Sequence, residues 1–328
     1  MNAAEELIEA YESIRARLPQ ARFCDHWRRL DSLEAVIDVY DVFLFDAFGV
    51  LNVGDTAIPG AARRIEALRA AGKRVMVVSN AASVPASALG DKYRRLGFDF
   101  RTDEIVSSRD ALCAALRGAD RDPLEVGWDR GGAGGPAVAG AMLAAPPGGA
   151  GFCWGAMAMA EADLSDLPVA VTPLGDDETG YVRSDGFILL SAADWSEARQ
   201  ARLTRALRQR PRPVLVANPD LVAPREHGWS LEPGHFARRL ERDTGIRCDY
   251  FGKPFANIFS IALRRLGAGV DYSRVLMVGD TLHTDVLGGR AAGLGTALAT
   301  DHGVSRGLDL EAVSARIGIR PDFVVRGI

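Results

Sequence analysis

The sequence is poor in cysteine and has no long apolar run. Its 328 residues include four cysteines, Cys24, Cys113, Cys153 and Cys248, none of them in a CxxC pair. This spacing suggests neither a zinc site nor a disulfide framework, and it fits a reducing cytoplasm. No apolar stretch reaches 18 residues, and the N-terminal MNAAEELIEA is acidic where a signal peptide would be basic. We therefore expect a cytoplasmic protein without a membrane partner.

Positive charge is also not in excess. The formal net charge is −4, with 25% charged and 48% hydrophobic residues, as in an ordinary soluble domain. No basic run stands out, so nothing favours binding to nucleic acid. Lysine is especially scarce: it occurs only at positions 73, 92 and 253, while arginine is abundant. Where this arginine-rich chain uses a lysine, we infer that the position needs a compact ammonium and not the planar guanidinium of arginine.

Short apolar runs alternate with helical patterns along the chain. The runs 42–45 and 74–78 are typical of strands buried on both faces, and Pro59 and Gly72 bracket a helix between them. This alternation predicts an α/β fold with a parallel sheet. Further helices are predicted at 3–18, 86–96, 195–209, 254–266 and 284–292, and further strands at 104–108, 185–191, 213–220, 275–278, 296–299 and 323–325.

A segment rich in Gly, Ala and Pro, residues 129–151, interrupts this pattern. It could be a pair of loops around a small helix, the edge of a second domain, or a phosphate-binding loop. The sequence lacks GxxxxGK[ST], and no convincing strand precedes a GxGxxG spacing. We therefore interpret the segment as loops.

Polar residues follow the predicted strands at their carboxyl ends. Asp46 follows VFLF, Ser79 follows VMVV, and Asp280 follows VLMVG. In a doubly wound sheet these ends meet at one crevice, where ligands bind. Lys253 comes after Gly252, and Asp285 lies in the first turn of the helix after Asp280.

Carboxylates, a hydroxyl and an ammonium at one edge suggest phosphate chemistry. Carboxylates alone would repel one another, and Mg²⁺, which prefers oxygen ligands, would relieve this repulsion. Ser79 and Lys253 would then hold phosphate oxygens. Asp46 would attack phosphorus and form an aspartyl-phosphate, while the ammonium and the metal stabilise the developing charge.

Each residue also has a simpler explanation. Asp46 alone could be a turn carboxylate, Lys253 a surface charge and Asp285 a helix cap. For Asp285 the capping role and the metal role are weighed equally. The common order and spacing of these residues favours a metal–phosphate site over separate structural roles. His227 and His235, in a loop after ANPD, fit surface or packing roles better than substrate contact.

Five motifs occur in the order seen in one known family. They are hhhDxxGV followed by Gly54 and Pro59-Gly60, then VVSNAAS, ANPD, FGKP and VGDTLHTD. Over residues 40–300 the chain resembles class IIA hydrolases of the haloacid dehalogenase superfamily, which include p-nitrophenyl, phosphoglycolate and pyridoxal phosphatases. The resemblance implies a Rossmann-like, doubly wound parallel-sheet core with an inserted α/β cap of the C2 type.

The resemblance also implies domain limits. Residues 1–115 would be the first part of the core, 116–245 the cap and 246–328 the second part of the core. The first 40 residues would be a helical extension, serving either as a dimer arm or as an extra layer on the core. The family is compatible with a homodimer.

Functional residues follow from the same resemblance. Asp46 would be the nucleophile and a Mg²⁺ ligand, together with the backbone carbonyl of Phe48 and with Asp280. Asp285 would support the metal or fix Lys253. Asn80 would assist at the phosphate. Asn218 and Asp220 belong to the cap segment that the family places over the substrate.

Phe48 departs from the family pattern, because active members usually have Asp there. That Asp protonates the leaving oxygen and then activates water, and such groups contribute about 10²–10⁴-fold to the rate. The resemblance includes a branch with an aromatic residue, more often Trp, at this position. Turnover would then be weak, or His283 or Asp55 would replace the acid, or the protein would bind a phosphorylated ligand without cleaving it. We expect a Mg²⁺-dependent phosphatase of a small phosphorylated metabolite, with an inactive phospholigand-binding protein as the alternative.

Overall fold

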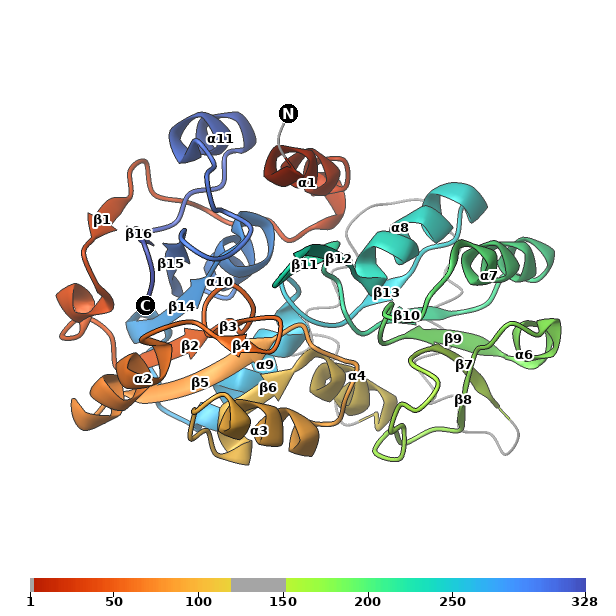
Figure 1. Cartoon of the computed structure of the whole chain (residues 1–328). Coiled ribbons are helices and arrows are strands. Elements are labelled where there is room, and N and C mark those ends of the chain that lie inside the picture. Colours follow the sequence, from red (N-terminus) through yellow and green to blue (C-terminus); the bar gives the residue numbers. More distant parts are fainter. Residues whose placement is uncertain (1–2, 119–151) are drawn as a thin grey trace.

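The chain folds into two lobes, each built on a parallel β-sheet (Figure 1). The computed structural model describes residues 3–118 and 152–328. The α/β fold with a Rossmann-like core is therefore confirmed. The predicted loops at 129–151 lie outside the described residues. No helix in the described ranges is long and apolar enough to cross a membrane.

The larger sheet has seven strands in the order β1-β16-β15-β14-β2-β5-β6, with every pair parallel. Its strands are β1 (Arg28–Leu30), β2 (Val42–Phe45), β5 (Arg74–Ser79), β6 (Ile105–Ser107), β14 (Val275–Gly279), β15 (Gly295–Ala299) and β16 (Phe323–Val325). β2 lies between β5 and β14, so the ends of these three strands are neighbours. The cap segment separates β14 from β2 and β5 in sequence but not in space.

Helices cover both faces of this sheet because its strands are apolar on both sides. Phe43 and Phe45 pack in one cluster with residues of α2 and α3, whereas Val42 and Leu44 pack in another with residues of α4 and α9. The helices of this lobe are α1 (Ala3–Glu12), α2 (Ala61–Ala70), α3 (Ala86–Arg95), α4 (Ser108–Leu116), α9 (Ala256–Leu266), α10 (Leu287–Ala291) and α11 (Leu310–Ile317). Short helical turns lie at Arg15–Arg17, Leu33–Val36, Thr102–Glu104, Tyr272–Arg274 and Leu282–Val286.

We call the second lobe the cap, after the prediction from the sequence, and its sheet has the order β13-β10-β9-β7-β8. Its elements are β7 (Trp154–Met157), β8 (Val171–Pro173), α6 (Glu178–Arg183), β9 (Gly186–Leu189), α7 (Glu197–Gln209), β10 (Val214–Val216), α8 (Pro233–Thr244) and β13 (Asp249–Tyr250). β13 pairs with β10, so this sheet extends past residue 245 to Tyr250.

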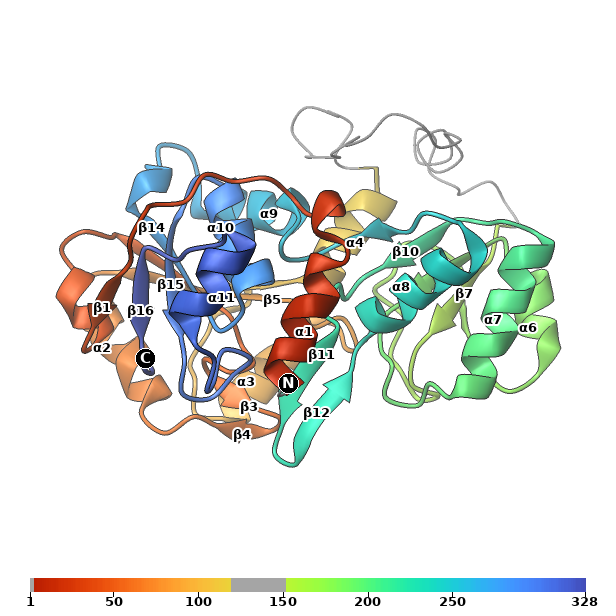
Figure 2. The ribbon, with the colours of Figure 1, turned by 90° about the horizontal axis from the view of Figure 1, so that it is seen from above.

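Two small hairpins lie beside the junction of the lobes. The core hairpin is β3 (Asn52–Val53) with β4 (Thr56–Ala57), and the cap hairpin is β11 (Val222–Arg225) with β12 (Gly228–Leu231). Seen from above, α1 lies between the core lobe and the cap hairpin (Figure 2). The N-terminal segment is thus a layer on the core that also reaches the cap.

Candidate active site

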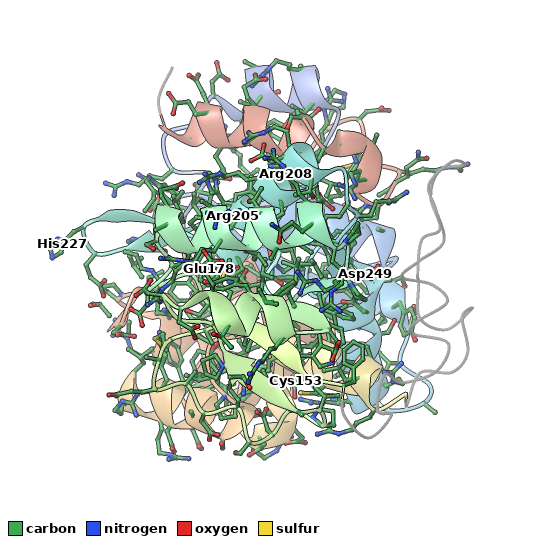
Figure 3. The ribbon with its side chains drawn as sticks, turned by 90° about the vertical axis from the view of Figure 1, so that its right-hand side faces the viewer. Cys153, Glu178, Arg205, Arg208, His227 and Asp249 are labelled. Atoms are coloured by element: carbon green, nitrogen blue, oxygen red, sulfur yellow. The ribbon has the colours of Figure 1, made fainter. Side chains whose placement is uncertain are left out.

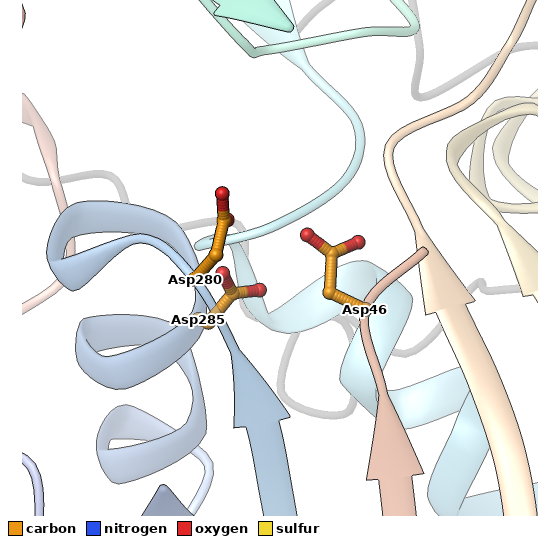
Figure 4. Close-up of side chains that lie close together, drawn as sticks. All are labelled: Asp46, Asp280 and Asp285. Atoms are coloured by element: carbon orange, nitrogen blue, oxygen red, sulfur yellow. The ribbon is translucent and has the colours of Figure 1, made fainter. Parts of the chain in front are cut away.

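Asp46 directly follows the central strand β2 and lies opposite Asp280 and Asp285 (Figure 4). Its backbone N–H donates to the carbonyl of Val278, which fixes the chain beside β14 (2.8 Å). Its Oδ1 accepts from the backbone N–H of Ala47 (2.6 Å). Burial raises the pKa of Asp46 to about 6, with Lys253 opposing and Asp285 adding to the rise. A side chain that remains 14% exposed can still meet a ligand.

Asp280 follows β14 and lies against two glycines. A Cβ on Gly49 would lie 2.4 Å from its Oδ2, and one on Gly303 would lie 1.8 Å away, so neither position has room for a side chain. The Thr281 hydroxyl donates to Oδ1 (2.8 Å) and the Val304 N–H donates to Oδ2 (2.6 Å). Burial, with the nearby carboxylates, raises the pKa of Asp280 to about 8.

Lys253 joins the two halves of the site. Its Nζ lies 2.6 Å from Asp46 Oδ1 and 2.7 Å from Asp285 Oδ1, and its side chain is 1% exposed. Burial lowers the pKa of Lys253, but Asp285, Asp46 and Asp220 more than offset this and hold it above its usual value. Asp285 Oδ2 also accepts from the N–H of Thr281 (3.0 Å). The ammonium therefore stays charged and fixes two carboxylates at once.

The arrangement fits a hard divalent cation. Asp46, Asp280 and Asp285 each offer an oxygen, and these atoms lie within 4.8 Å of one another. Among the described residues, the Lys253 ammonium contacts two of these three carboxylates. Burial is the main cause of the raised pKa values of Asp46 and Asp280, and the neighbouring carboxylates add to it. Oxygen donors with surplus negative charge suit Mg²⁺.

Ser79 and Asn80, at the end of β5, differ in the partners they have. Ser79 is buried, and its hydroxyl accepts from the N–H of Ala81 (3.2 Å). Asn80 holds the Lys253 loop: its Oδ1 accepts from Lys253 N–H (2.7 Å) and Ser108 Oγ (3.0 Å). Its Nδ2 donates to Asp220 (2.8 Å) and to the Lys253 carbonyl (3.0 Å). With all four amide positions used, Asn80 is equipped to position Lys253.

Asn218 and Asp220 occupy different places. Asn218 donates to Glu232 (3.0 Å) and so braces the base of the cap hairpin. Asp220 contacts Asn80 at the core and is close enough to Asp46 for that carboxylate to affect it. Burial raises the pKa of Asp220, with Lys253 lowering it and Asp46 raising it. Asp220 is thus the cap residue of this pair that reaches the core site.

Phe48 has neighbours that we did not foresee from the sequence. Lys92 Nζ lies 4.9 Å, and the guanidinium carbon of Arg225 4.8 Å, from its ring centroid. Lys92 comes from α3 in the core, and Arg225 comes from the cap hairpin. The scarcity of lysine was a signal for Lys92, whereas nothing in the sequence pointed to Arg225.

Neither residue considered as a replacement acid fits that role. His283 is fully buried, its ring stacks on Tyr11 (5.0 Å, 9°), and its Nε2 contacts Glu12 Oε1 (2.7 Å). Burial lowers the pKa of His283 to about 4. Asp55 is paired with Lys92 (2.7 Å), which lowers its pKa, and its side chain is 90% exposed.

The two cap histidines fit the simpler roles favoured by the sequence. His227 projects outward at the tip of the cap hairpin (Figure 3). His235 lies in the first turn of α8 and packs edge-on against Phe236 (5.2 Å). Among the described contacts, neither joins the carboxylate cluster.

Comparison with known families adds to this geometry. Residues 43–130 match the haloacid dehalogenase-like hydrolase family, and residues 250–328 match a second family described as HAD-hydrolase-like. The matched ranges contain all the carboxylates of the cluster and Lys253.

Individual relatives cover most of the chain. Human glycerol-3-phosphate phosphatase is 32% identical over 90% of this chain and 91% of its own length. Human chronophin is 34% identical over 80% of this chain and 81% of its own.

Solved structures share the fold. A possible sugar phosphatase from Cytophaga hutchinsonii has a TM-score of 0.72 and 26% identity, over 92% of this chain and 98% of that one. A glycerol phosphate phosphatase from Mycobacterium tuberculosis, solved in complex with magnesium, has a TM-score of 0.60 and 23% identity, over 88% of this chain and 76% of that one.

Proposed function

This chain belongs to the haloacid dehalogenase-like hydrolases as a class IIA phosphatase, and from that premise we propose that it is a Mg²⁺-dependent phosphatase of a small phosphorylated metabolite. The observation that carries the proposal is the contact of Lys253 with Asp46 and Asp285 beside Asp280. The Lys253 ammonium and the carboxylates that such chemistry needs thus lie together beside the carboxyl ends of β2 and β14.

The reacting residue in this proposal is Asp46. Its free carboxylate oxygen attacks phosphorus, the bond to the leaving oxygen breaks, and an aspartyl-phosphate forms. Lys253 and the Ser79 hydroxyl hold the phosphoryl oxygens, and the ammonium stabilises their increasing charge. Water then attacks the phosphorus and releases inorganic phosphate and free Asp46.

The residues that would hold the metal are Asp46, Asp280 and Asp285, with the backbone carbonyl of Phe48. When bound, Mg²⁺ would draw negative charge from phosphoryl oxygens and neutralise that of the carboxylates. Asp285 has a second task in our proposal, because its Oδ1 orients Lys253. Asp220 and Asn80 keep the cap strand and the Lys253 loop together around the substrate.

Phe48 limits this chemistry. A phenyl ring neither protonates the leaving oxygen nor activates water, and the structure leaves His283 and Asp55 unsuited to do so. We therefore propose that turnover is weak and depends strongly on the leaving group. The alternative, a protein that binds phosphorylated ligands without cleaving them, is favoured by the same residue.

The test is hydrolysis of p-nitrophenyl phosphate and of glycerol 3-phosphate with Mg²⁺. We expect p-nitrophenyl phosphate to be cleaved much faster, because nitrophenolate leaves without a proton, and Asp46→Asn to abolish turnover. If wild type cleaves neither ester but gains thermal stability from phosphate with Mg²⁺, the binding alternative holds. Turnover that persists in Asp46→Asn would overturn the assignment of the nucleophile.

We also propose a cytoplasmic location and leave the homodimer as a prediction. The four cysteines are unpaired, as expected in a reducing compartment.

A further inference from the structure

The cap hairpin lies on the core hairpin beside the candidate site. The Gly54 N–H donates to the carbonyl of Pro224 (3.3 Å), and the Asp55 N–H donates to Glu226 Oε1 (2.7 Å). The Thr56 hydroxyl donates to the same Glu226 oxygen (3.3 Å). These contacts join two turns that are about 170 residues apart in sequence.

Gly54 makes this close approach possible. Its φ is +56°, which a residue with a side chain rarely adopts. A Cβ at this position would lie 1.9 Å from Glu226 Oε2. The glycine therefore allows both the backbone conformation of the core turn and the close approach of Glu226 at the tip of the cap hairpin.

The ring of Phe48 contacts one cation from each lobe, Lys92 from the core and Arg225 from the cap. Lys92 is held within the core by Asp55 (2.7 Å) and by the Gly54 carbonyl (3.1 Å). Arg225 is held within the cap by Glu232 (2.9 Å) and Ser230 (2.8 Å). Because both cations are already oriented, meeting the ring costs little additional side-chain entropy.

We propose that Phe48 is a positioning residue that fastens the cap hairpin to the core over Asp46. The ring at this position links Arg225 in the cap with Lys92 in the core through its π face. In this proposal the aromatic side chain helps to hold the cap on the core, in addition to leaving the site without an acid at position 48. The link itself does not depend on the proposed phosphatase activity, although its effect on substrate binding does.

Hydrogen exchange measured by mass spectrometry tests the link without using activity. The variants are Phe48→Leu, Phe48→Trp, Arg225→Met and the double variant Phe48→Leu/Arg225→Met. We expect Phe48→Leu and Arg225→Met each to speed exchange in segments 52–57 and 222–231 by about two- to five-fold, since a cation–π contact is worth roughly 0.5–1 kcal/mol. Phe48→Trp should keep wild-type protection, because indole binds cations at least as well.

Non-additivity is the deciding result. If the ring and the guanidinium act on each other, the double variant should exchange no faster than the faster single variant. Additive effects, or wild-type exchange in Phe48→Leu, would overturn the proposal, as would Phe48→Trp behaving like Phe48→Leu. Arg94→Met is the matched control, because Arg94 lies on the same helix as Lys92 and pairs locally with Asp91.

Kinetics then measure the consequence for the site. The variant for this measurement is Arg225→Met, because Arg225 lies in the cap hairpin and has no place in the proposed catalytic or metal-binding set. We expect Arg225→Met to raise KM for p-nitrophenyl phosphate about three-fold with kcat within about two-fold, as a less populated closed cap predicts. A fall in kcat alone would contradict a positioning role. Lack of activity in every variant would overturn the proposed function but leave the exchange result intact.

Discussion

Lys253 holds two carboxylates of the site at once, Asp46 and Asp285. Burial acts against the negative charge of Asp46, and the Lys253 ammonium opposes that effect by lowering the pKa of Asp46. Removing one partner of a buried ion pair leaves the other unbalanced and typically costs about 3–5 kcal/mol. The same charge faces the phosphate in our proposal. We therefore expect the Nζ atom of Lys253 to contribute to both the stability and the activity of the protein.

We predict that Lys253→Met lowers the free energy of unfolding by about 3 kcal/mol and kcat by about 10²-fold or more. Lys253→Arg should keep more stability than Lys253→Met, because the positive charge remains. It should still lose most activity, because a guanidinium is larger than the ammonium in a site where Lys253 is 1% exposed. Urea unfolding and p-nitrophenyl phosphate hydrolysis measure the two effects.

Lys73→Met is the control for this comparison. Lys73 pairs at 3.7 Å with Asp41, whose side chain is 54% exposed, so losing this pair should change stability and activity little. If Lys253→Met keeps near-normal stability, then the ammonium is not needed to balance the buried carboxylates that it contacts.

Asp249 offers a pH test outside the site. Burial raises its pKa to about 6, and its Oδ2 has no hydrogen-bond partner among the described residues. The folded protein therefore holds this proton up to about pH 6, whereas the unfolded chain releases it near pH 3.8. The free energy of unfolding should fall as pH rises from about 4 to 6 and stay lowered above that.

We predict that Asp249→Asn raises the free energy of unfolding by about 1–2 kcal/mol at pH 7.5 and leaves it unchanged at pH 4. The figure for pH 7.5 is reduced because Asp249 is partly exposed to solvent. Urea unfolding at both pH values checks this. Asp103→Asn, whose exposed carboxylate is bound to Arg101, should not reproduce the gain. A gain of equal size at pH 4 would show that ionisation is not the cause.

At the scale of elements, the buried strands were predicted well and the junctions were not. Runs such as VFLF and VLMV are apolar on both faces, so their assignment needed only local information. The helix predicted at 3–18 ends instead at Glu12, where the Ser13 hydroxyl donates to the Ala10 carbonyl. The helix predicted at 284–292 begins as a π-helical turn at Leu282–Val286. Both differences arise where α1 packs on the core, a contact that no local pattern encodes.

Helix α1 couples the lobes through Tyr11. Its ring stacks on His283, it packs with Leu282, and its hydroxyl accepts from the N–H of Leu221 in the cap (3.4 Å). Arg238 of α8 also donates to the carbonyl of Ala10 and to Ser13. The helix therefore contributes to the stability of core and cap together.

We predict that Tyr11→Ala lowers the free energy of unfolding by about 3 kcal/mol or more, through lost burial and the cavity it leaves. Tyr11→Phe should cost about 1 kcal/mol, the value of one hydrogen bond. Chemical denaturation measures both, with Glu6→Ala on the exposed face of α1 as control. Equal effects of Tyr11→Ala and Glu6→Ala would show that α1 does not stabilise the fold.

At the scale of the whole molecule, the order of motifs predicted which residues meet but not how the lobes touch. Asp46, Lys253, Asp280 and Asp285 were brought together by the rule that parallel strands share one functional edge. The cations around Phe48 come from a core helix and a cap hairpin whose contact depends on the packing of both lobes. The roles of Asn80 and Asn218 in bracing loops likewise required the contacts themselves.

The cap insertion gives the metal site a structural consequence. Asp46 lies in the first part of the core, whereas Asp280 and Asp285 lie more than 200 residues later. A cation bound by all three would tie together two segments that the cap separates in sequence. Since the unfolded chain cannot hold these oxygens close, binding would stabilise only the folded state.

We predict that Mg²⁺ at about 100 times its dissociation constant adds about 2.7 kcal/mol to the free energy of unfolding, and so raises Tm by several degrees. Asp280→Asn should lose this increment. Without metal the variant should be at least as stable as wild type, because burial already disfavours the charge of Asp280. Sodium chloride at matched ionic strength controls for screening. If Asp280→Asn gains as much as wild type, then Mg²⁺ does not bind through Asp280 and the proposed metal site is wrong.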